Sequence, residues 1–328
     1  MTLKAALVGV GKWGQRLVKA TQGKSDVLTF TAGATRTVAK AEDFCRAQGM
    51  TLTGDLKTML KDPAIDMVVI CTPHSQHDKQ IVAAARAGKH VFVIKPMTMT
   101  LRTAKAASAA ADKAGVLLGV GFPWRHFPAT KELKRLVTSG ELGIVSHVES
   151  NYCVPRFMNF KPEDWKTQLD EQPPGCLITH SVDILTDLLG PIASLSVVSM
   201  NRVVPWKIDD VTSLLCRFKN GASGYIGSSG ATASIFRLTV FGSKAWAEIR
   251  NETRLEIQPA AGEKSTVIDY PSDAGDDSLR WELESFANAI QGKPTYPWSR
   301  QHDLHGVAVG DAVIKAAKAE KVVKVSGV

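Results

Sequence analysis

Residues 3–14 read LKAALVGVGKWG, an apolar run that passes directly into the motif Gly9-x-Gly11-x-x-Gly14. The run predicts a buried strand, and residues 13–22 have the pattern of a helix. Glycines between a strand and a helix allow a tight turn and a close backbone approach to a pyrophosphate, although they also occur in plain structural turns. A second strand that ends about twenty residues later favours a dinucleotide site. Its expected residues are Gly9, Gly11, Lys12, Trp13 and Gly14.

The first third of the chain continues this alternation of strand-like and helical patterns. Strand, helix, strand at this spacing predicts a doubly wound α/β domain with a parallel sheet over residues 1–122. The expected strands are 3–10, 27–34, 67–71, 91–94 and 116–120, and the expected helices are 13–22, 38–48, 76–87 and 101–114.

Residues 123–328 have a different sequence pattern, in which consecutive strand-like alternations of apolar and polar residues are separated by turn signals. Short turns between strands indicate an antiparallel or mixed sheet, so we expect a second domain of the α+β class. The expected strands are 195–200, 211–218, 224–227, 236–241, 245–250, 254–258 and 265–270, and the expected helices are 129–139, 180–189, 278–291 and 302–319.

Composition excludes several classes of protein. With 328 residues, 44% hydrophobic and 22% charged, the chain is long enough for two domains and is not typical of a disordered protein. No apolar run approaches the roughly 18 residues of a membrane span, and the N-terminus does not resemble a signal peptide. Five scattered cysteines without a CxxC pair argue against a disulfide framework and a zinc site. We therefore expect a cytoplasmic protein.

The net charge of +8 is unevenly distributed. Residues 1–122 hold 17 basic and 8 acidic residues, whereas the remainder holds 23 and 24. An anionic ligand of the first domain or a generic basic surface would both account for the excess. Because no basic stripe interleaved with aromatic residues is present, nucleic-acid binding ranks last.

The segment after the second strand selects between the two nicotinamide cofactors. NAD-binding domains usually carry an acidic residue there, to hydrogen-bond the ribose. This chain has Thr35 and Arg36 instead, and a guanidinium pairs well with a 2′-phosphate. NADP is therefore the preferred cofactor, with NAD possible; the alternative is that Arg36 is a solvated loop charge.

Cys71-Thr72-Pro73-His74 follows the strand expected at 67–71, at the sheet edge where ligands of doubly wound domains lie. We assign these residues, with His77, to cofactor binding. His74 and His77 have the i, i+3 spacing of metal ligands, but no third ligand stands near them in the sequence. Surface positions at a helix N-terminus are the favoured interpretation, and no metal is expected.

The motifs together resemble the glucose–fructose oxidoreductase / inositol dehydrogenase (Gfo/Idh/MocA) family in order along essentially the whole chain. The resemblance implies an NAD(P)-dependent oxidoreductase whose second domain is an open-faced, largely antiparallel sheet that often forms the subunit interface. The matching segments are the glycine motif, Cys71-Thr72-Pro73-His74-x-x-His77, Ala87-Gly88-Lys89-His90-Val91-x-x-x-Lys95-Pro96, Trp124-Arg125-His126-Phe127-Pro128, Ser139-Gly140-Glu141-Leu142-Gly143, Trp165-Lys166 and His180-Ser181-Val182-Asp183.

The resemblance also implies the catalytic residues. Lys95 and His180 match the family's lysine and histidine beside the reacting carbon, and Asp183 matches the acid one turn after the histidine. Hydride transfer at a carbinol carbon needs a partner for the hydroxyl proton, and a partly desolvated lysine at a strand end suits that role. His180 and Asp183 share one helix face, so the acid can orient the imidazole.

The family's glutamate before the lysine is Ile94 here, and its frequent aspartate four residues before the histidine is Cys176. These departures predict an altered proton relay or substrate site. Lys95 and Pro96, with Arg125, are also assigned to cofactor binding. The residues assigned to substrate are Tyr152, Trp165 and Cys176.

The sequence thus predicts an NADP(H)-preferring oxidoreductase acting on a sugar, polyol or related hydroxy/keto compound. We expect a homodimer or homotetramer formed through the C-terminal sheet, with no nucleic-acid or membrane partner. Two alternatives remain: a glycosidase-like member with tightly held NAD, and a non-catalytic dinucleotide-binding sensor.

Overall fold

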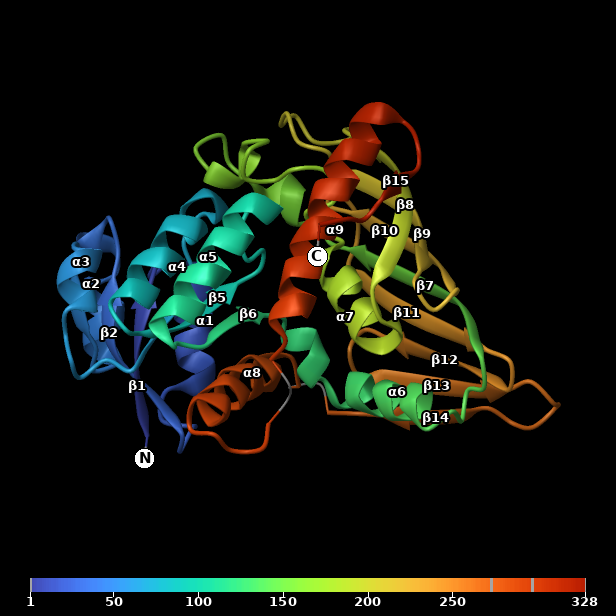
Figure 1. Ribbon diagram of the computed structural model, residues 1–328, viewed down its shortest axis with the longest axis horizontal. Coiled ribbons are helices and arrows are strands. Elements are labelled where there is room, and N and C mark those ends of the chain that lie inside the picture. Colours follow the sequence, from blue (N-terminus) through green and yellow to red (C-terminus); the bar gives the residue numbers. More distant parts are fainter. Residues whose placement is uncertain (1, 272–273, 296–297, 328) are drawn as a thin grey trace. The chain divides into compact units, whose positions relative to one another are not determined.

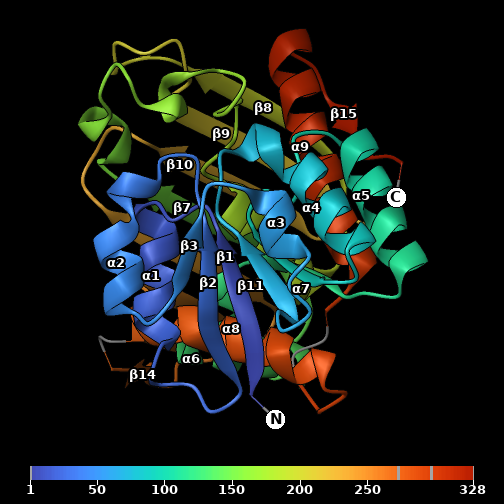
Figure 2. The same cartoon turned by 90° about the vertical axis from the view of Figure 1, so that its left-hand side faces the viewer.

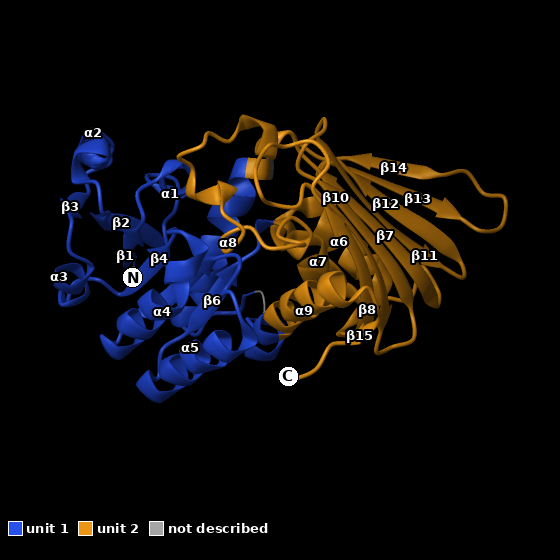
Figure 3. Ribbon diagram, turned by 90° about the horizontal axis from the view of Figure 1, so that it is seen from above, with its two compact units in different colours: residues 1–123, 276–304 blue, residues 124–275, 305–328 orange. Residues whose placement is uncertain are grey.

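The computed structural model describes residues 2–271, 274–295 and 298–327. Its contacts divide the chain into two compact units (Figure 3). Unit 1 comprises residues 1–123 and 276–304, and unit 2 comprises residues 124–275 and 305–328. Of the helices that the described residues form, none combines the length and the apolar character needed to cross a membrane.

Unit 1 is built on a six-stranded parallel sheet with the strand order β3-β2-β1-β4-β5-β6. This order, reversing between β1 and β4, is that of a doubly wound dinucleotide-binding domain, so the predicted fold class is confirmed. Residues of β4 are fully buried, as expected for a central parallel strand covered on both faces. The strands are β1 (Leu3–Val8), β2 (Leu28–Ala34), β3 (Thr51–Thr53), β4 (Met67–Ile70), β5 (His90–Ile94) and β6 (Leu118–Gly121).

The helices of unit 1 begin and end at recognisable signals. Helix α5 starts after Thr100, whose hydroxyl accepts a hydrogen bond from the Thr103 N–H, and it stops at Gly115 in the left-handed conformation, with φ of 67°. The elements are α1 (Lys12–Thr21), η1 (Val38–Lys40), α2 (Glu42–Ala47), α3 (Leu56–Leu60), η2 (His74–Gln76), α4 (His77–Arg86), α5 (Leu101–Ala114) and α8 (Ala274–Ile290) (Figures 1 and 2).

Helix α8 belongs to the core of unit 1, although the sequence predicts it in the second domain. Phe286 packs edge-on against Phe92 of β5 and against Trp298, with ring centroids 5.7 and 5.3 Å apart. A Cβ atom on Gly119 would lie 2.8 Å from the Phe286 ring. Residues 276–304 therefore return to the first sheet, because their apolar face completes its hydrophobic core.

Unit 2 contains a nine-stranded sheet with the order β14-β13-β12-β11-β7-β10-β9-β8-β15. Strands β7 and β10 are parallel and the other neighbouring pairs are antiparallel, so the sheet is mixed and largely antiparallel, as predicted. The strands are β7 (Val145–Cys153), β8 (Ile192–Met200), β9 (Val211–Phe218), β10 (Ser223–Ser229), β11 (Ile235–Gly242), β12 (Ala245–Arg250), β13 (Arg254–Pro259), β14 (Thr266–Asp269) and β15 (Val323–Lys324).

Helices cover one face of this sheet, as Figure 3 shows for α6, α7 and α9. Residues such as Leu214 of β9 and Leu238 of β11 are buried, whereas the neighbouring Leu215 points to the other face and is exposed, so one face of the sheet packs in the core. The remaining elements are η3 (Pro123–His126), α6 (Pro128–Thr138), η4 (Arg156–Asn159), η5 (Trp165–Thr167), α7 (Thr179–Leu189) and α9 (Arg300–Ala319). Residue 123 of η3 and residues 300–304 of α9 belong to unit 1.

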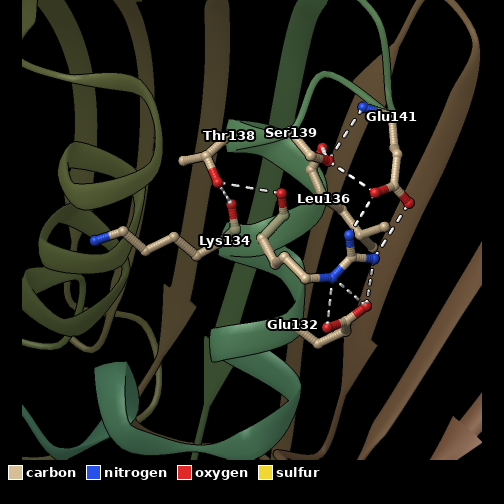
Figure 4. Close-up of polar contacts among 7 residues, drawn as sticks. Glu132, Lys134, Leu136, Thr138, Ser139 and Glu141 are labelled. Atoms are coloured by element: carbon tan, nitrogen blue, oxygen red, sulfur yellow. Dashed lines mark hydrogen bonds and ion pairs between the residues drawn. The ribbon is translucent and has the colours of Figure 1, made fainter.

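Helix α6 ends where the sequence predicts, at Ser139 and Gly140. Gly140 has φ of 75°, and the Ser139 hydroxyl donates to the Leu136 carbonyl at 3.3 Å (Figure 4). Arg135 pairs with both Glu132 and Glu141 beside this turn. The hydrogen bonds from Arg135 and Ser139 lower the pKa of Glu141, so its carboxylate stays charged where the helix ends.

Candidate active site

The glycine loop of unit 1 is a backbone cradle. Gly9 has φ of 94°, and a Cβ atom there would lie 2.7 Å from the Cys71 carbonyl oxygen. A Cβ atom on Gly14 would lie 2.5 Å from the Gly9 oxygen, so neither position accommodates a side chain. Gly11, which precedes α1, has no atom within 4 Å of its ideal Cβ position. This open space in front of the N–H groups of a helix fits the pyrophosphate of a dinucleotide.

The residues expected to select the cofactor follow β2. The Thr35 amide donates to the Thr53 carbonyl at 3.1 Å, which ties the start of this loop to β3. Arg36 is exposed, as is Lys12 at the start of α1, whereas Trp13 is half-buried. An exposed guanidinium on an anchored loop can bind a phosphate, because its planar donors reach two oxygens at once.

The carboxyl end of β4 carries Cys71, Thr72 and Pro73. The Thr72 hydroxyl donates to Oε1 of Gln80 at 2.6 Å, so the start of α4 fixes this side chain. Burial, and then the charge of Glu282, raise the pKa of the Cys71 thiol. Cys71 is therefore a neutral packing residue under the glycine loop at ordinary pH, and it lacks the thiolate that nucleophilic chemistry requires.

His74 and His77 are buried, with 8% and 0% of their surfaces exposed, so the prediction of surface positions was wrong. Nδ1 of His77 lies 2.8 Å from the Pro96 carbonyl oxygen, and Nε2 lies 3.1 Å from that of Thr72. Both contacts are hydrogen bonds when the ring carries a proton on each nitrogen. The imidazole thus braces the loops after β4 and β5, a role that the i, i+3 spacing did not reveal.

Lys95 and Pro96 directly follow β5 and are half-buried. The lysine therefore lies at the carboxyl edge of the parallel sheet, where the glycine loop after β1 and Thr72 after β4 also lie. Partial burial at this edge suits a lysine that exchanges protons. Within the part of unit 1 and unit 2 that the structure describes, no three His, Cys, Asp or Glu side chains form a group able to hold a metal ion.

In unit 2, His180 occupies the first turn of α7 inside a group of aromatic rings. The imidazole is stacked on the Trp124 indole, with centroids 4.6 Å apart and planes inclined by 21°. The Tyr152 ring stands edge-on to both, at 6.0 Å from His180 and 4.7 Å from Trp124. The structure therefore brings together two predicted residues, His180 and Tyr152, and adds Trp124.

Asp183 lies one helical turn after His180 and is engaged by Arg125. Nε of Arg125 donates to Oδ2 at 2.6 Å, and Nη2 bonds Oδ1. The two side chains are only 5% and 2% exposed, so the ion pair is bidentate and buried. The sequence predicts Arg125 at the cofactor and Asp183 beside the imidazole, whereas these hydrogen bonds join the two residues to each other.

Cys176 lies just before α7, against a small apolar cluster formed by Phe157, Leu177, Val204 and Ile208. Its side chain thus packs against apolar residues, at the position where the family that the sequence resembles often carries an aspartate. Trp165 begins η5, and Nζ of Lys166 lies 5.2 Å from the centroid of its ring.

Trp124 contacts the predicted site residues, although the sequence does not predict this role. The residue was visible as part of the segment around Arg125, but nothing in the local sequence indicates which ring it contacts. Only the packing of η3 against α7 makes this evident. The predicted site residues in unit 1 are Gly9, Gly11, Lys12, Trp13, Gly14, Thr35, Arg36, Cys71, Thr72, Pro73, His74, His77, Lys95 and Pro96, and those in unit 2 are Arg125, Tyr152, Trp165, Cys176, His180 and Asp183.

Comparison with known protein families identifies both parts of the chain. Residues 3–122 match the profile described as "Oxidoreductase family, NAD-binding Rossmann fold", and residues 130–248 match the "GFO/IDH/MocA C-terminal domain". Both profiles belong to the family that the sequence motifs resemble.

Curated relatives include two inositol dehydrogenases. The scyllo-inositol 2-dehydrogenase (NAD(+)) of Bacillus subtilis is 32% identical over 194 residues, which are 56% of this chain and 50% of that protein. The inositol 2-dehydrogenase of Rhizobium meliloti is 26% identical over 337 residues, covering 99% of this chain and all of that protein (100%).

Solved structures share the fold over the whole chain. An NAD-binding oxidoreductase from Klebsiella pneumoniae superposes with a TM-score of 0.89 at 21% identity, with 100% of each chain covered. A levoglucosan dehydrogenase in complex with NADH and L-sorbose gives the same TM-score, 0.89, at 21% identity and with 100% of both chains covered.

Proposed function

Because the chain belongs to the Gfo/Idh/MocA family of oxidoreductases, we propose that it transfers hydride between NADP(H) and a sugar, polyol or related hydroxy/keto compound. The observation that carries this proposal is the glycine cradle in front of α1, at the same sheet edge as Lys95. The names of the inositol dehydrogenase relatives support a polyol or sugar as substrate.

The proposed roles follow from the chemistry of a carbinol carbon. A bound nicotinamide accepts or supplies the hydride. Lys95 takes the hydroxyl proton in oxidation and returns it in reduction, since its ammonium can lose a proton when partly desolvated. His180 assists this transfer, and Asp183 supports the helix turn that carries His180. The backbone N–H groups at Gly11 and the start of α1 orient the pyrophosphate.

The preference for NADP rests on the loop after β2. Thr35 is fixed by its backbone hydrogen bond to Thr53, and the exposed Arg36 guanidinium is available for the additional phosphate. An acidic residue in this position would instead hydrogen-bond the ribose hydroxyls of NAD and repel the phosphate.

Binding titrations test the cofactor preference. NADPH and NADH are titrated separately by nicotinamide fluorescence against the wild type, Arg36→Ala and the control Arg46→Ala. Arg46 is an exposed arginine of α2 that pairs with Asp43. Arg36→Ala is expected to weaken NADPH binding about ten- to a hundredfold while NADH binding and the control stay unchanged. Tighter binding of NADH by the wild type would overturn the preference.

Turnover measurements test the catalytic assignment. Sugars and polyols are screened by absorbance of the reduced nicotinamide, and Lys95→Met is compared on the best substrate with Lys105→Met, an exposed lysine of α5. Loss of a proton-transfer group lowers kcat about 10²- to 10⁴-fold, and the control is expected to match the wild type. Unchanged turnover in Lys95→Met would refute the assignment.

Two other outcomes would contradict this function and support one of the two alternatives. Turnover of a glycoside without net formation or consumption of NADPH would indicate the glycosidase-like alternative with tightly held NAD. Cofactor binding without turnover across the panel would indicate a dinucleotide-binding sensor.

We propose that the open face of the second sheet joins two or four copies. Val198 and Leu215 on this face are 58% and 60% exposed, and Tyr225 lies opposite Leu215 on the neighbouring strand. Large exposed apolar side chains on one face of a sheet favour an interface. Sedimentation of the wild type and of Leu215→Asp tests this: the wild type should be a dimer or tetramer and the variant should dissociate, whereas a monomeric wild type would contradict the proposal.

We propose the cytoplasm as the compartment of the protein. The five cysteines form no disulfide. Burial raises the pKa values of Cys45 and Cys216, so these thiols stay protonated and poorly reactive. Such cysteines suit a reducing environment.

A further inference from the structure

We propose that Trp124 is a positioning residue that sets the plane of the His180 imidazole; this inference rests on the proposed role of His180 in proton transfer. The two rings are stacked, with centroids 4.6 Å apart and an interplanar angle of 21°. Trp124 is 5% exposed, whereas His180 is half-buried. A fixed, buried indole therefore supports one face of a more accessible imidazole.

The indole is itself held from other directions. Phe236 of β11 packs against it with a centroid distance of 4.3 Å and an angle of 49°, and Tyr152 of β7 stands edge-on at 4.7 Å and 82°. Trp124 also belongs to the main hydrophobic core of unit 2. Because the indole is almost completely buried and packs against these two rings, it acts as a rigid support.

Arg125, the residue of η3 that follows Trp124, fixes the position of helix α7, which carries His180. It holds the buried carboxylate of Asp183, one turn beyond His180 on α7. Two consecutive residues of η3 thus contact two residues of α7 at the spacing i, i+3. The ion pair fixes the position of the helix turn, and the stacked indole fixes the ring that this turn carries.

This arrangement matters because proton transfer depends on direction. An imidazole transfers a proton along the axis of one ring nitrogen, so rotation of the ring displaces the proton from its line of transfer. Stacking places the indole against the face of the imidazole, and it restricts rotation about the bond to the ring. Trp124 therefore acts through His180 and does not need to touch the substrate.

The test is a double-mutant cycle with kinetic and spectroscopic readouts. Trp124→Leu removes the flat ring, Trp124→Phe keeps one, and Trp124→Met replaces the leucine variant if that variant does not fold. Each change is made in the wild type and in His180→Asn. Phe218→Leu is the control, because it is a buried aromatic residue of the same core, located on β9.

We expect Trp124→Leu or Trp124→Met to lower kcat about ten- to a hundredfold, with little change in the KM for NADPH. Trp124→Phe should restore most of kcat. In the His180→Asn background the same substitutions should lower kcat no further, whereas Phe218→Leu should have the same effect in both backgrounds, within about twofold.

Nuclear magnetic resonance of the ring protons of histidine gives a readout that is independent of turnover. The ring current of a stacked indole should shift the His180 protons upfield, and Trp124→Leu should abolish the shift. His180→Asn assigns the signal by its disappearance.

The two proposals can fail separately. If His180→Asn keeps the kcat of the wild type, the proposed role of His180 fails and its positioning with it. If His180→Asn lowers kcat but Trp124→Leu adds its full loss in that background, or leaves the His180 signal in place, only the positioning role of Trp124 is overturned.

Discussion

Arg125 and Asp183 form a bidentate ion pair in which both side chains are almost completely removed from solvent. Removing one partner of a buried pair leaves an uncompensated charge, which costs about 3–5 kcal/mol. Asp183→Asn should therefore lower the free energy of unfolding of unit 2 by that amount in urea titrations. Asp43→Asn, which removes an exposed pair with Arg46, should leave stability unchanged. Equal stability of the two variants would contradict the structural role of the buried pair.

Two substitutions in the glycine loop should have different effects, one on the stability of the protein and the other on its affinity for the cofactor. Gly9→Ala places a Cβ atom 2.7 Å from a backbone oxygen at a φ of 94°, so it should destabilise the cofactor-free protein by about 1–3 kcal/mol. Gly11→Ala meets no atom within 4 Å and should change stability by less than about 0.5 kcal/mol. Because its methyl group would occupy the space assigned to the pyrophosphate, NADPH binding should weaken at least about tenfold. Full affinity in Gly11→Ala would place the cofactor elsewhere.

His77 should contribute both to stability and to cofactor binding. His77→Phe leaves the Thr72 and Pro96 carbonyls without the imidazole, which should cost about 1–3 kcal/mol in urea unfolding. NADPH binding should weaken too, since the loop carrying Lys95 loses its brace. His77→Gln retains one link and should lie between the wild type and His77→Phe. His147→Gln, on a strand of unit 2, is the control and should bind NADPH normally; a normal affinity in His77→Phe would refute the brace.

Buried His126 should make the protein less stable in mild acid. Desolvation, followed by the charges of Lys131 and Arg125, lowers its pKa to about 3. The unfolded chain takes up this proton below the ordinary pKa of about 6.5, whereas the folded chain does not. The contribution of His126 is thus fully present above that pH and is lost as the pH falls. Between pH 7.5 and 5.5 it should decrease by about 1.4 kcal/mol.

Urea unfolding of the wild type and of His126→Asn at the two pH values measures this effect. The wild type should lose more stability on acidification than the variant, which has no imidazole at this position. Parallel losses in both proteins would show that His126 does not carry the pH dependence.

Much of the fold was accessible from the sequence because its local signals are strong. The helix expected at residues 101–114 is α5, with Thr100 and Gly115 at its ends. Strand β7 was missed, because its outward face carries His147 and Glu149 and its inward face includes Ser150, so apolar alternation is weak. An amphipathic pattern predicted α8 as a helix but could not show which sheet its apolar face covers.

The site was predictable where backbone geometry dictates residue type, as in the glycine cradle, and less so where distant side chains meet. The burial of His77 depends on two carbonyls from other loops, and the stacking of Trp124 on His180 depends on the packing of η3 against α7. Neither relationship has a local signature, because each joins residues that are separated along the chain.

The return of α8 to the first sheet has a consequence for synthesis of the protein. Leu279, Leu283 and Phe286 complete the core of unit 1, yet the ribosome makes them after strands β7 to β14 of unit 2. A nascent chain that ends before residue 276 therefore has an N-terminal sheet with part of its apolar face uncovered. Maturation of the nucleotide-binding half is thus tied to the last part of translation, and a fragment cut after residue 123 should aggregate instead of folding as a stable domain.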